Sequence, residues 1–364
     1  WRTDAQIRSN PVVPLPPGQI PALLPLDLER FTKPLIYWES ARGCPFRCHF
    51  CSSATEQLRL RPMSALRDDL QRLSRIENRT VKVLDRSFHL GRQRTLTLLR
   101  ALLDTPPSLR FHLELNPDRL STEALALFAT APPGKFQFEI GLQTFNGEVL
   151  QRIDRSMDVA RGVAAIQRLI APRRHPVHLD LIVGLPGETA ASCRAALDRA
   201  FLLYPDHLQL GILKLLPGTP LRAMADQYGY RWDRHPPYEI LAHEQLDFTE
   251  LRRFKLFAEL LERLWNSDRL PHVVMRLVSH HFDHSLSALF DALLRESRDT
   301  LATLSMQPER LFAALLEICQ EPLARDPRLV QLFCWDYLRH ATPGRERLAW
   351  IKAQIGERRP VTLD

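Results

Sequence analysis

Short β-rich runs alternate with amphipathic runs through the first two thirds of the chain. The β-rich runs occupy residues 35–41, 81–85, 111–115, 136–142, 177–185 and 207–215. Apolar positions recur at helical spacing between them, over residues 64–77, 92–104, 121–129, 158–170 and 188–203. Strict alternation of strand and helix predicts a parallel sheet with right-handed crossovers. Six such units predict an α/β fold in the form of a partial, three-quarter parallel β/α barrel rather than a closed barrel of eight.

From about residue 243 the pattern is helical throughout. Phe254, Phe257, Leu260, Leu261 and Leu264 form one apolar stripe, and similar stripes recur over 285–296, 307–319, 326–340 and 344–355. We therefore predict an all-α C-terminal domain over 236–364, following a partial barrel over 34–235.

The residues before the barrel have a different composition. Residues 11–26 contain six prolines, which favour extended backbone and cannot donate ladder hydrogen bonds. We interpret residues 1–33 as a proline-rich linker and expect a further domain, absent from this sequence, before it.

Composition narrows the class of protein. The net charge is +7, but basic and acidic residues are interleaved along helical stretches, and no basic segment carries interspersed aromatic residues, which argues against nucleic-acid binding. No apolar run reaches the roughly 18 residues of a membrane-spanning helix, and the first residues do not resemble a secretory signal. Three of the six cysteines are grouped and three are scattered, unlike a disulfide framework, which favours a reducing cytoplasm.

The grouped cysteines are Cys44, Cys48 and Cys51, in the stretch CPFRCHFC directly after the first predicted strand. In parallel α/β folds, chemistry collects at this carboxyl end of the strands. A structural four-iron cluster normally takes four cysteines, so three thiolates leave one iron open for a ligand. Two alternatives are a zinc site that takes His49 as its fourth ligand and three buried cysteines that act as small hydrophobic residues.

This loop and the barrel pattern resemble the radical S-adenosylmethionine (SAM) superfamily over about residues 34–230. The resemblance implies a 4Fe-4S cluster whose open iron chelates SAM, and reductive cleavage of SAM to methionine and a 5'-deoxyadenosyl radical. It also implies a small-molecule substrate and a reducing partner such as flavodoxin or ferredoxin.

Further candidate site residues follow from the same resemblance. In the related oxygen-independent coproporphyrinogen oxidases, matching positions hold the ribose, the amino acid and the sulfonium region of SAM. This implies such roles for Glu114 in LELNP, Gln143 in EIGLQTFN, Arg155 in RIDRSMD and Asp180 in LDLIVGLPGET.

Weaker matches complete the predicted set. Phe50 and the backbone at Lys214 and Leu215 match positions near adenine, and Gly184 permits a tight turn after the fifth strand. Two more candidates are Trp38, at a position that is aromatic in some relatives, and Asp85, which stands where the family usually has a glycine-rich segment that contacts the amino group of SAM.

The segments around residues 138–158 and 213–241 resemble the cobalamin-dependent branch, particularly members with an uncharacterised helical C-terminal domain. Cobalamin is therefore a candidate cofactor, although no corrin-binding motif is present. The alternatives are an enzyme like oxygen-independent coproporphyrinogen oxidase, a methylthiotransferase, or a non-enzymatic Fe-S or SAM sensor. The sequence assigns no catalytic residue and no substrate.

Overall fold

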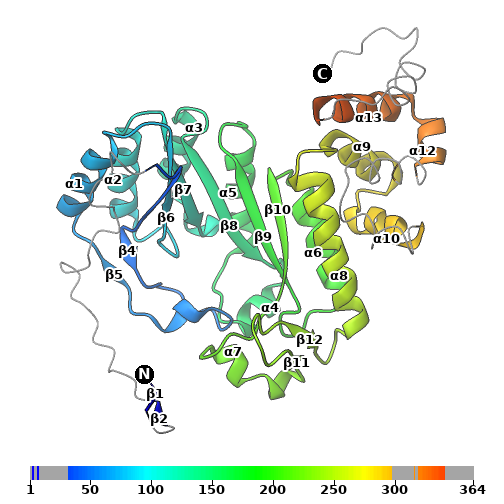
Figure 1. Ribbon diagram of the computed structural model, residues 1–364, viewed down its shortest axis with the longest axis horizontal. Coiled ribbons are helices and arrows are strands. Elements are labelled where there is room, and N and C mark those ends of the chain that lie inside the picture. Colours follow the sequence, from blue (N-terminus) through cyan, green and yellow to red (C-terminus); the bar gives the residue numbers. More distant parts are fainter. Residues whose placement is uncertain (1, 4–5, 8–31, 297–314, 316–318, 341–364) are drawn as a thin grey trace.

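The computed structural model describes residues 2–3, 6–7, 32–296, 315 and 319–340. At its centre is a six-stranded parallel sheet in the order β3-β6-β7-β8-β9-β10 (Figure 1). Its strands are β3 (Leu35–Trp38), β6 (Arg79–Val83), β7 (Leu109–Leu115), β8 (Phe136–Gln143), β9 (Val177–Val183) and β10 (His207–Ile212). The strands are in chain order, so each crossover joins neighbours. The predicted partial α/β barrel of six units is confirmed.

Helices follow the strands on the outside of the sheet. These are α1 (Met63–Leu73), α2 (Arg92–Leu103), α3 (Thr122–Thr130), α4 (Gly147–Arg152), α5 (Val159–Ile170), α6 (Ala190–Phe201) and α7 (Pro220–Ala223). Three short antiparallel pairs among the described residues form sheets of their own: β1 (Arg2–Thr3) with β2 (Gln6–Ile7), β4 (Ala41–Arg42) with β5 (Arg59–Leu60), and β11 (Arg231–Trp232) with β12 (Ile240–Ala242). Residues 8–31, which include the predicted linker's prolines, lie outside the described residues.

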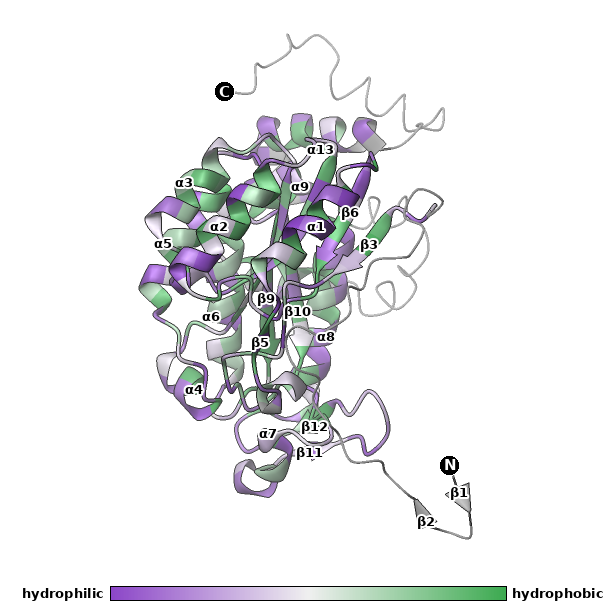
Figure 2. Ribbon diagram, turned by 90° about the vertical axis from the view of Figure 1, so that its left-hand side faces the viewer, coloured by the Kyte–Doolittle hydropathy of each residue, from purple (hydrophilic) through white to green (hydrophobic). Residues whose placement is uncertain are grey.

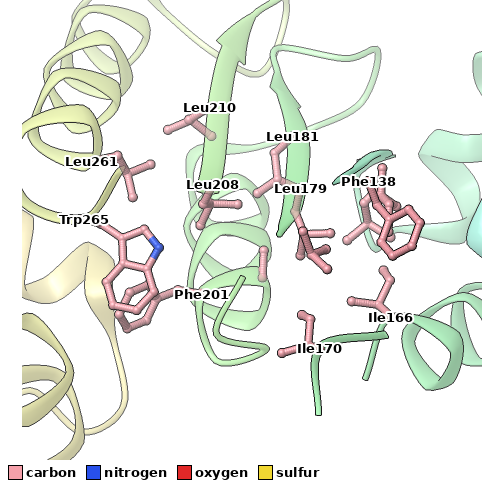
Figure 3. Packing of buried hydrophobic residues seen from close by; sticks show 14 of the residues in the cluster. Phe138, Ile166, Ile170, Leu179, Leu181, Phe201, Leu208, Leu210, Leu261 and Trp265 are labelled. Carbon is pink, nitrogen blue, oxygen red and sulfur yellow. The ribbon is translucent and has the colours of Figure 1, made fainter. Parts of the chain in front are cut away.

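The strands are apolar on one face only. In β8 the fully buried Phe136, Phe138 and Ile140 alternate with partly buried polar or small residues, and β7 and β9 repeat this period of two. The apolar face packs against the helices: Phe138 lies close to Ile166 of α5 in Figure 3, and its ring is 4.7 Å from that of Phe128 in α3. The other face lines the inside of the open barrel.

The helices show the matching pattern. In Figure 2, single helices such as α3 and α5 carry both hydrophilic and hydrophobic residues. Their apolar sides meet the sheet, and their polar sides face outward. Among the described residues no helix is both long and apolar enough to cross a membrane.

From α8 onward the described part of the predicted C-terminal domain is helical, as expected, but its first residues include the short strand β12. It contains α8 (Phe248–Leu261), a π-helical turn (Glu262–Asn266), α9 (Pro271–His281), α10 (Leu286–Glu296), α12 (Gln320–Arg325) and α13 (Pro327–His340). The helix expected over 344–355 and most of that expected over 307–319 lie outside the described residues.

This region closes the edge of the sheet. The side-chain amide of Asn266 accepts from Leu208 N at 2.9 Å and donates to Leu208 O at 3.0 Å, so it pairs backbone groups that strand β10 would otherwise leave open. Trp265 packs on Phe201, with ring centroids 4.8 Å apart, and its indole donates to Pro205 O at 3.1 Å (Figure 3).

We expect Phe138→Ala to lower the free energy of unfolding by about 3–5 kcal/mol, because the change leaves a cavity between β8, α3 and α5. Thermal and urea unfolding of the apoprotein measure this loss. Phe248→Ala is the control, because Phe248 is 56% exposed, and it should change stability little. Equal effects of the two changes would contradict the packing described here.

Candidate functional site

The cysteine loop leaves β4 through a turn that requires glycine. Gly43 has a φ of +85°, and a Cβ at this position would lie 2.4 Å from Gln57 O. Further along, Cys51 N donates to Cys48 O at 3.0 Å. The loop therefore doubles back tightly enough to bring its three thiols to one side.

Two backbone hydrogen bonds hold the loop against the rest of the barrel. His49 N donates to Ile153 O at 2.8 Å, at the end of α4, and Leu221 N donates to His49 O at 3.0 Å, at the start of α7. The His49 imidazole Nδ1 lies 3.2 Å from Arg152 O. This ring lines an outer cavity and is absent from the lining of the pocket that all three cysteines share.

That shared pocket is a cavity of about 210 Å³ at the carboxyl end of the strands. All three predicted metal ligands line it: Cys44, Cys48 and Cys51. Five of the predicted SAM-binding residues line it as well: Phe50, Glu114, Gln143, Arg155 and Asp180. Three strands (β7, β8 and β9), the segment after α4 and the cysteine loop thus converge on one space.

Two carboxyl groups in the pocket have no hydrogen-bond partner among the described residues. These are Glu114 and Asp180, on β7 and β9. Burial, followed by the charge of Glu139, raises the pKa of both, and the pKa of Asp180 rises to about 7. Near neutral pH, Asp180 is therefore available both as a proton donor and as an acceptor.

Glu139 of β8 has the opposite character. Its carboxylate lies 2.7 Å from His112 Nε2 and 3.2 Å from Lys82 Nζ. The hydrogen bond to His112 and the charge of Lys82 lower its pKa to about 2, in spite of burial. Glu139 therefore stays ionised and fixes a negative charge on the barrel's inner face between Glu114 and Asp180.

Arg155 and Gln143 present unused polar atoms. Among the described residues, Arg155 Nε and Gln143 Oε1 are buried without a hydrogen-bond partner. Gln143 also has a φ of +68°, in a region that residues other than glycine rarely adopt. A Cβ at Gly141 would come within 2.3 Å of Gln143 Nε2. A bound ligand would give both orphaned atoms a partner, and glycine makes room for the Gln143 amide.

Two other predicted residues support the start of the loop from outside the pocket. Trp38 is fully buried on the helix-facing side of β3, where its indole donates to Asp69 Oδ2 at 2.8 Å. Asp85 accepts from Ser40 N at 2.7 Å and Ala41 N at 3.1 Å. Burial raises the pKa of Asp85 to about 6.

The remaining three candidates lie near the ends of β9 and β10, also outside the pocket's lining. Gly184 has a φ of +89°, and its carbonyl accepts from Tyr230 Oη at 2.8 Å. Lys214 forms an isolated β-bridge with Glu239, and Leu215 N donates to Tyr238 O at 2.9 Å.

Among the pocket-lining residues that the sequence reasoning missed are Phe46, Asn116, Glu139 and Gly141. The spacing along the chain could have indicated the last three. Asn116 comes two residues after Glu114, and Glu139 and Gly141 come four and two residues before Gln143, so a strand period of two directs them to the same side. Arg86, which follows β6, also lines the pocket.

The donor set fits a cluster better than a single ion. Within the described residues, no three His, Cys, Asp or Glu side chains are grouped so as to hold one metal ion. A four-iron cluster binds each thiolate at a separate iron, so its cysteines surround a volume rather than a point. Burial raises the pKa of Cys44, with the neighbouring thiols of Cys48 and Cys51 adding to the effect. Bound iron would offset that cost by stabilising the thiolates.

Comparison with known proteins identifies the barrel. Residues 38–200 match the family described as "Radical SAM superfamily". The chain carries a radical SAM domain. Residues 226–359, after this domain, match a family described as "Protein of unknown function (DUF4080)".

The relatives of this chain have diverse activities. The chain is 28% identical to "Ribosomal protein uS12 methylthiotransferase RimO" of Chloroflexus aurantiacus, over 67% of this chain and 60% of the relative. It is also 28% identical to "Cobalamin-dependent radical SAM methyltransferase TokK" of Streptomyces tokunonensis, over 53% of this chain and 30% of the relative. The chain thus spans less than two thirds of either relative.

A solved structure shares the fold. The cobalamin-dependent SAM radical enzyme OxsB, in its apo form, covers 97% of this chain and 59% of its own, with a TM-score of 0.52 and 12% sequence identity. At this identity the likeness describes the fold alone.

Replacement of Asp180 tests the electrostatics of the pocket that the three cysteines share. The pKa of this carboxyl is about 7 in the folded protein, against 3.8 for an ordinary aspartate, so the folded state binds more protons between these values. Its contribution to the free energy of unfolding therefore falls as pH rises from about 4 to about 7, by at most about 1.4 kcal/mol per pH unit.

We expect Asp180→Asn to abolish this loss, so that the variant becomes more stable relative to wild type as pH rises from 5 to 8. Thermal unfolding of both apoproteins across this range measures the difference. A difference that does not change with pH would contradict the raised pKa.

Replacement of Cys48 tests the metal ligands. We expect Cys48→Ala to fold but to lose the brown chromophore, iron and sulfide of anaerobically reconstituted protein, because one corner of the cluster loses its thiolate. Cys193→Ala, which changes a buried cysteine outside the pocket, should retain all three. Full iron and sulfide content in Cys48→Ala would contradict the ligand assignment.

Proposed function

We propose that this protein is a radical SAM enzyme that cleaves SAM reductively at a 4Fe-4S cluster held by Cys44, Cys48 and Cys51, and so starts radical chemistry on a small molecule. One observation carries the proposal. The three thiols open into the same pocket as two unpartnered carboxyl groups and the orphaned polar atoms of Arg155 and Gln143. Bound cluster supplies the electron that breaks a carbon–sulfur bond of SAM.

The chain's own residues provide the groups that SAM requires. Glu114 can accept from the two ribose hydroxyls, and the free Nε–H of Arg155 can donate to the methionine carboxylate. Asp180, with a pKa of about 7, and Gln143 Oε1 can accept from the ammonium group. Phe50 offers an apolar surface for adenine.

The inner face of the barrel gives the substrate a polar environment. Glu139, Lys82 and His112 form a fixed network of ionised and hydrogen-bonding groups directly beside the pocket. A substrate with hydroxyl, amine or carbonyl groups suits this face better than a hydrocarbon does. The electron comes from an external reductant, for which flavodoxin and ferredoxin are the candidates.

A cobalamin-dependent reaction, such as methyl transfer or rearrangement, is the second candidate. It is supported by the relative whose name describes a cobalamin-dependent radical SAM methyltransferase. The methylthiotransferase relative supports a methylthiotransferase-like reaction in the same way. Retention of hydroxocobalamin through reconstitution and gel filtration would support the cobalamin-dependent reaction.

A single-turnover assay tests the proposed function. Anaerobically reconstituted protein, reduced with dithionite and mixed with SAM, should form 5'-deoxyadenosine and methionine, which mass spectrometry quantifies. Cys48→Ala should form neither. An intact cluster that binds SAM without cleaving it would instead identify a sensor and contradict the enzyme proposal.

The affinity of the reconstituted protein for SAM tests the role of Glu114. We expect Glu114→Gln to weaken SAM binding about tenfold or more, because hydrogen bonds to a charged acceptor contribute about 1.5–3 kcal/mol. Glu123→Gln is the matched control, because Glu123 is exposed and pairs with Arg92 on the surface. Unchanged SAM affinity in Glu114→Gln would contradict the assigned ribose contact.

A further inference from the structure

A chain of hydrogen bonds leads from the end of β6 to the cysteine loop. Asn116 Nδ2 donates to Ser87 Oγ at 2.9 Å, and Asn116 Oδ1 accepts from Arg155 Nη2 at 3.1 Å. Arg155 Nη1 donates to Cys48 Sγ at 3.4 Å. The four residues come from four separate segments, so the fold rather than the local sequence brings them together.

This chain fixes the guanidinium group in one orientation. Besides Asn116, the Gly141 carbonyl accepts from Nη2, so both protons of that nitrogen are directed to acceptors on β7 and β8. Because the guanidinium is planar, fixing Nη2 also fixes the direction of Nη1. Nη1 then meets a sulfur atom that is itself buried. Ser87, only 1% exposed, holds Asn116 in place and so orients the arginine indirectly.

A donor at a cysteine sulfur has an electronic consequence in an iron–sulfur centre. Reduction adds negative charge to the cluster and its thiolates. A hydrogen bond from a positively charged guanidinium group therefore stabilises the reduced form more than the oxidised form. Hydrogen bonds to the sulfur atoms are among the factors that set the reduction potentials of such clusters. The Cys44 and Cys51 thiols have no comparable side-chain donor among the described residues.

We propose that Asn116, held by Ser87, is a positioning residue that directs Arg155 at Cys48 Sγ and thereby raises the reduction potential of the cluster. The inference rests on the proposed function, because it requires a cluster on the three cysteines. It assigns Arg155 two tasks through different atoms: Nη1 acts on the cluster ligand, and Nε remains for the methionine carboxylate of SAM.

The test is a redox titration of the reconstituted cluster without SAM, monitored by electron paramagnetic resonance. Asn116→Ala retains the charge of Arg155 but removes the acceptor that orients it. We expect the reduction equilibrium to shift about tenfold toward the oxidised form, which corresponds to a potential about 59 mV lower for a one-electron couple. Ser87→Ala, which removes only the support for Asn116, should shift the potential less and in the same direction.

Ser156→Ala is the matched control. Its hydroxyl accepts from Arg119 Nη2 at 3.1 Å, so the change removes one arginine acceptor directly beside Arg155 without touching the chain described above. Its potential should equal that of wild type. A wild-type potential in both Asn116→Ala and Ser87→Ala, or an equal shift in Ser156→Ala, would overturn the inference while leaving the proposed function intact. Failure of the wild-type protein to hold any cluster would instead overturn the proposed function.

Discussion

The structure depends on one constraint: helices must cover one face of the six-stranded parallel sheet, while the other face stays polar. The strands meet this constraint because their apolar residues alternate with polar or small ones. In β8, Phe136, Phe138 and Ile140 enter the core, and the inside of the barrel is lined by Glu139, Gly141 and Gln143. Burial of aromatic rings against α3 and α5 supplies most of the driving force at this point of the sheet. The same alternation determines which residues can reach a ligand. It places Glu114, Glu139 and Asp180 on neighbouring strands with no helix between them and the pocket.

Grouping three carboxyl groups in this way is electrostatically unfavourable, and the described residues supply a partner for only one of them. Glu139 receives both a lysine and a histidine, so its charge is compensated within the protein. Glu114 and Asp180 receive no partner among the described residues, and the charge of Glu139 adds to the cost of ionising them. Burial and the charge of Glu139 thus raise the pKa of Glu114 and of Asp180, whereas the hydrogen bond to His112 and the charge of Lys82 lower the pKa of Glu139. This arrangement suits a site whose missing partners arrive with a ligand, since hydroxyl and ammonium groups would satisfy the two carboxyls that the protein leaves open.

The sequence was sufficient to predict the six strands, their parallel order and the cysteine loop, because each depends on local patterns such as β-rich runs, helical spacing and the C-x3-C-x2-C arrangement. It did not distinguish the residues that line the pocket from those that support it. Trp38 ends β3 and Asp85 follows β6, so both stand at the carboxyl ends of strands like the lining residues, yet their partners Asp69 and Ser40 hold them outside the pocket. Asn116 and Glu139 were missed because long-range contacts, rather than a local motif, give them their roles. Their roles come from contacts with Arg155, Lys82 and His112, which lie 27 to 57 positions away along the chain. The roles assigned to the lining residues, and the domain boundaries, stay predictions.

The boundary between barrel and helical region illustrates how far the two parts depend on one another. The sequence places it after residue 235, but the contacts across it are dense. Ile240 N donates to Leu213 O at 3.0 Å, and a Cβ at Gly184 would meet the Ile240 side chain. Further on, Asn266 pairs the open backbone of β10. An open six-stranded barrel has an exposed edge strand that a closed barrel lacks, and here residues of the region of unknown function provide its hydrogen bonds. That region therefore takes part in the folding of the barrel, and changes in it should reach the pocket through β9 and β10 even where none of its residues contacts a ligand.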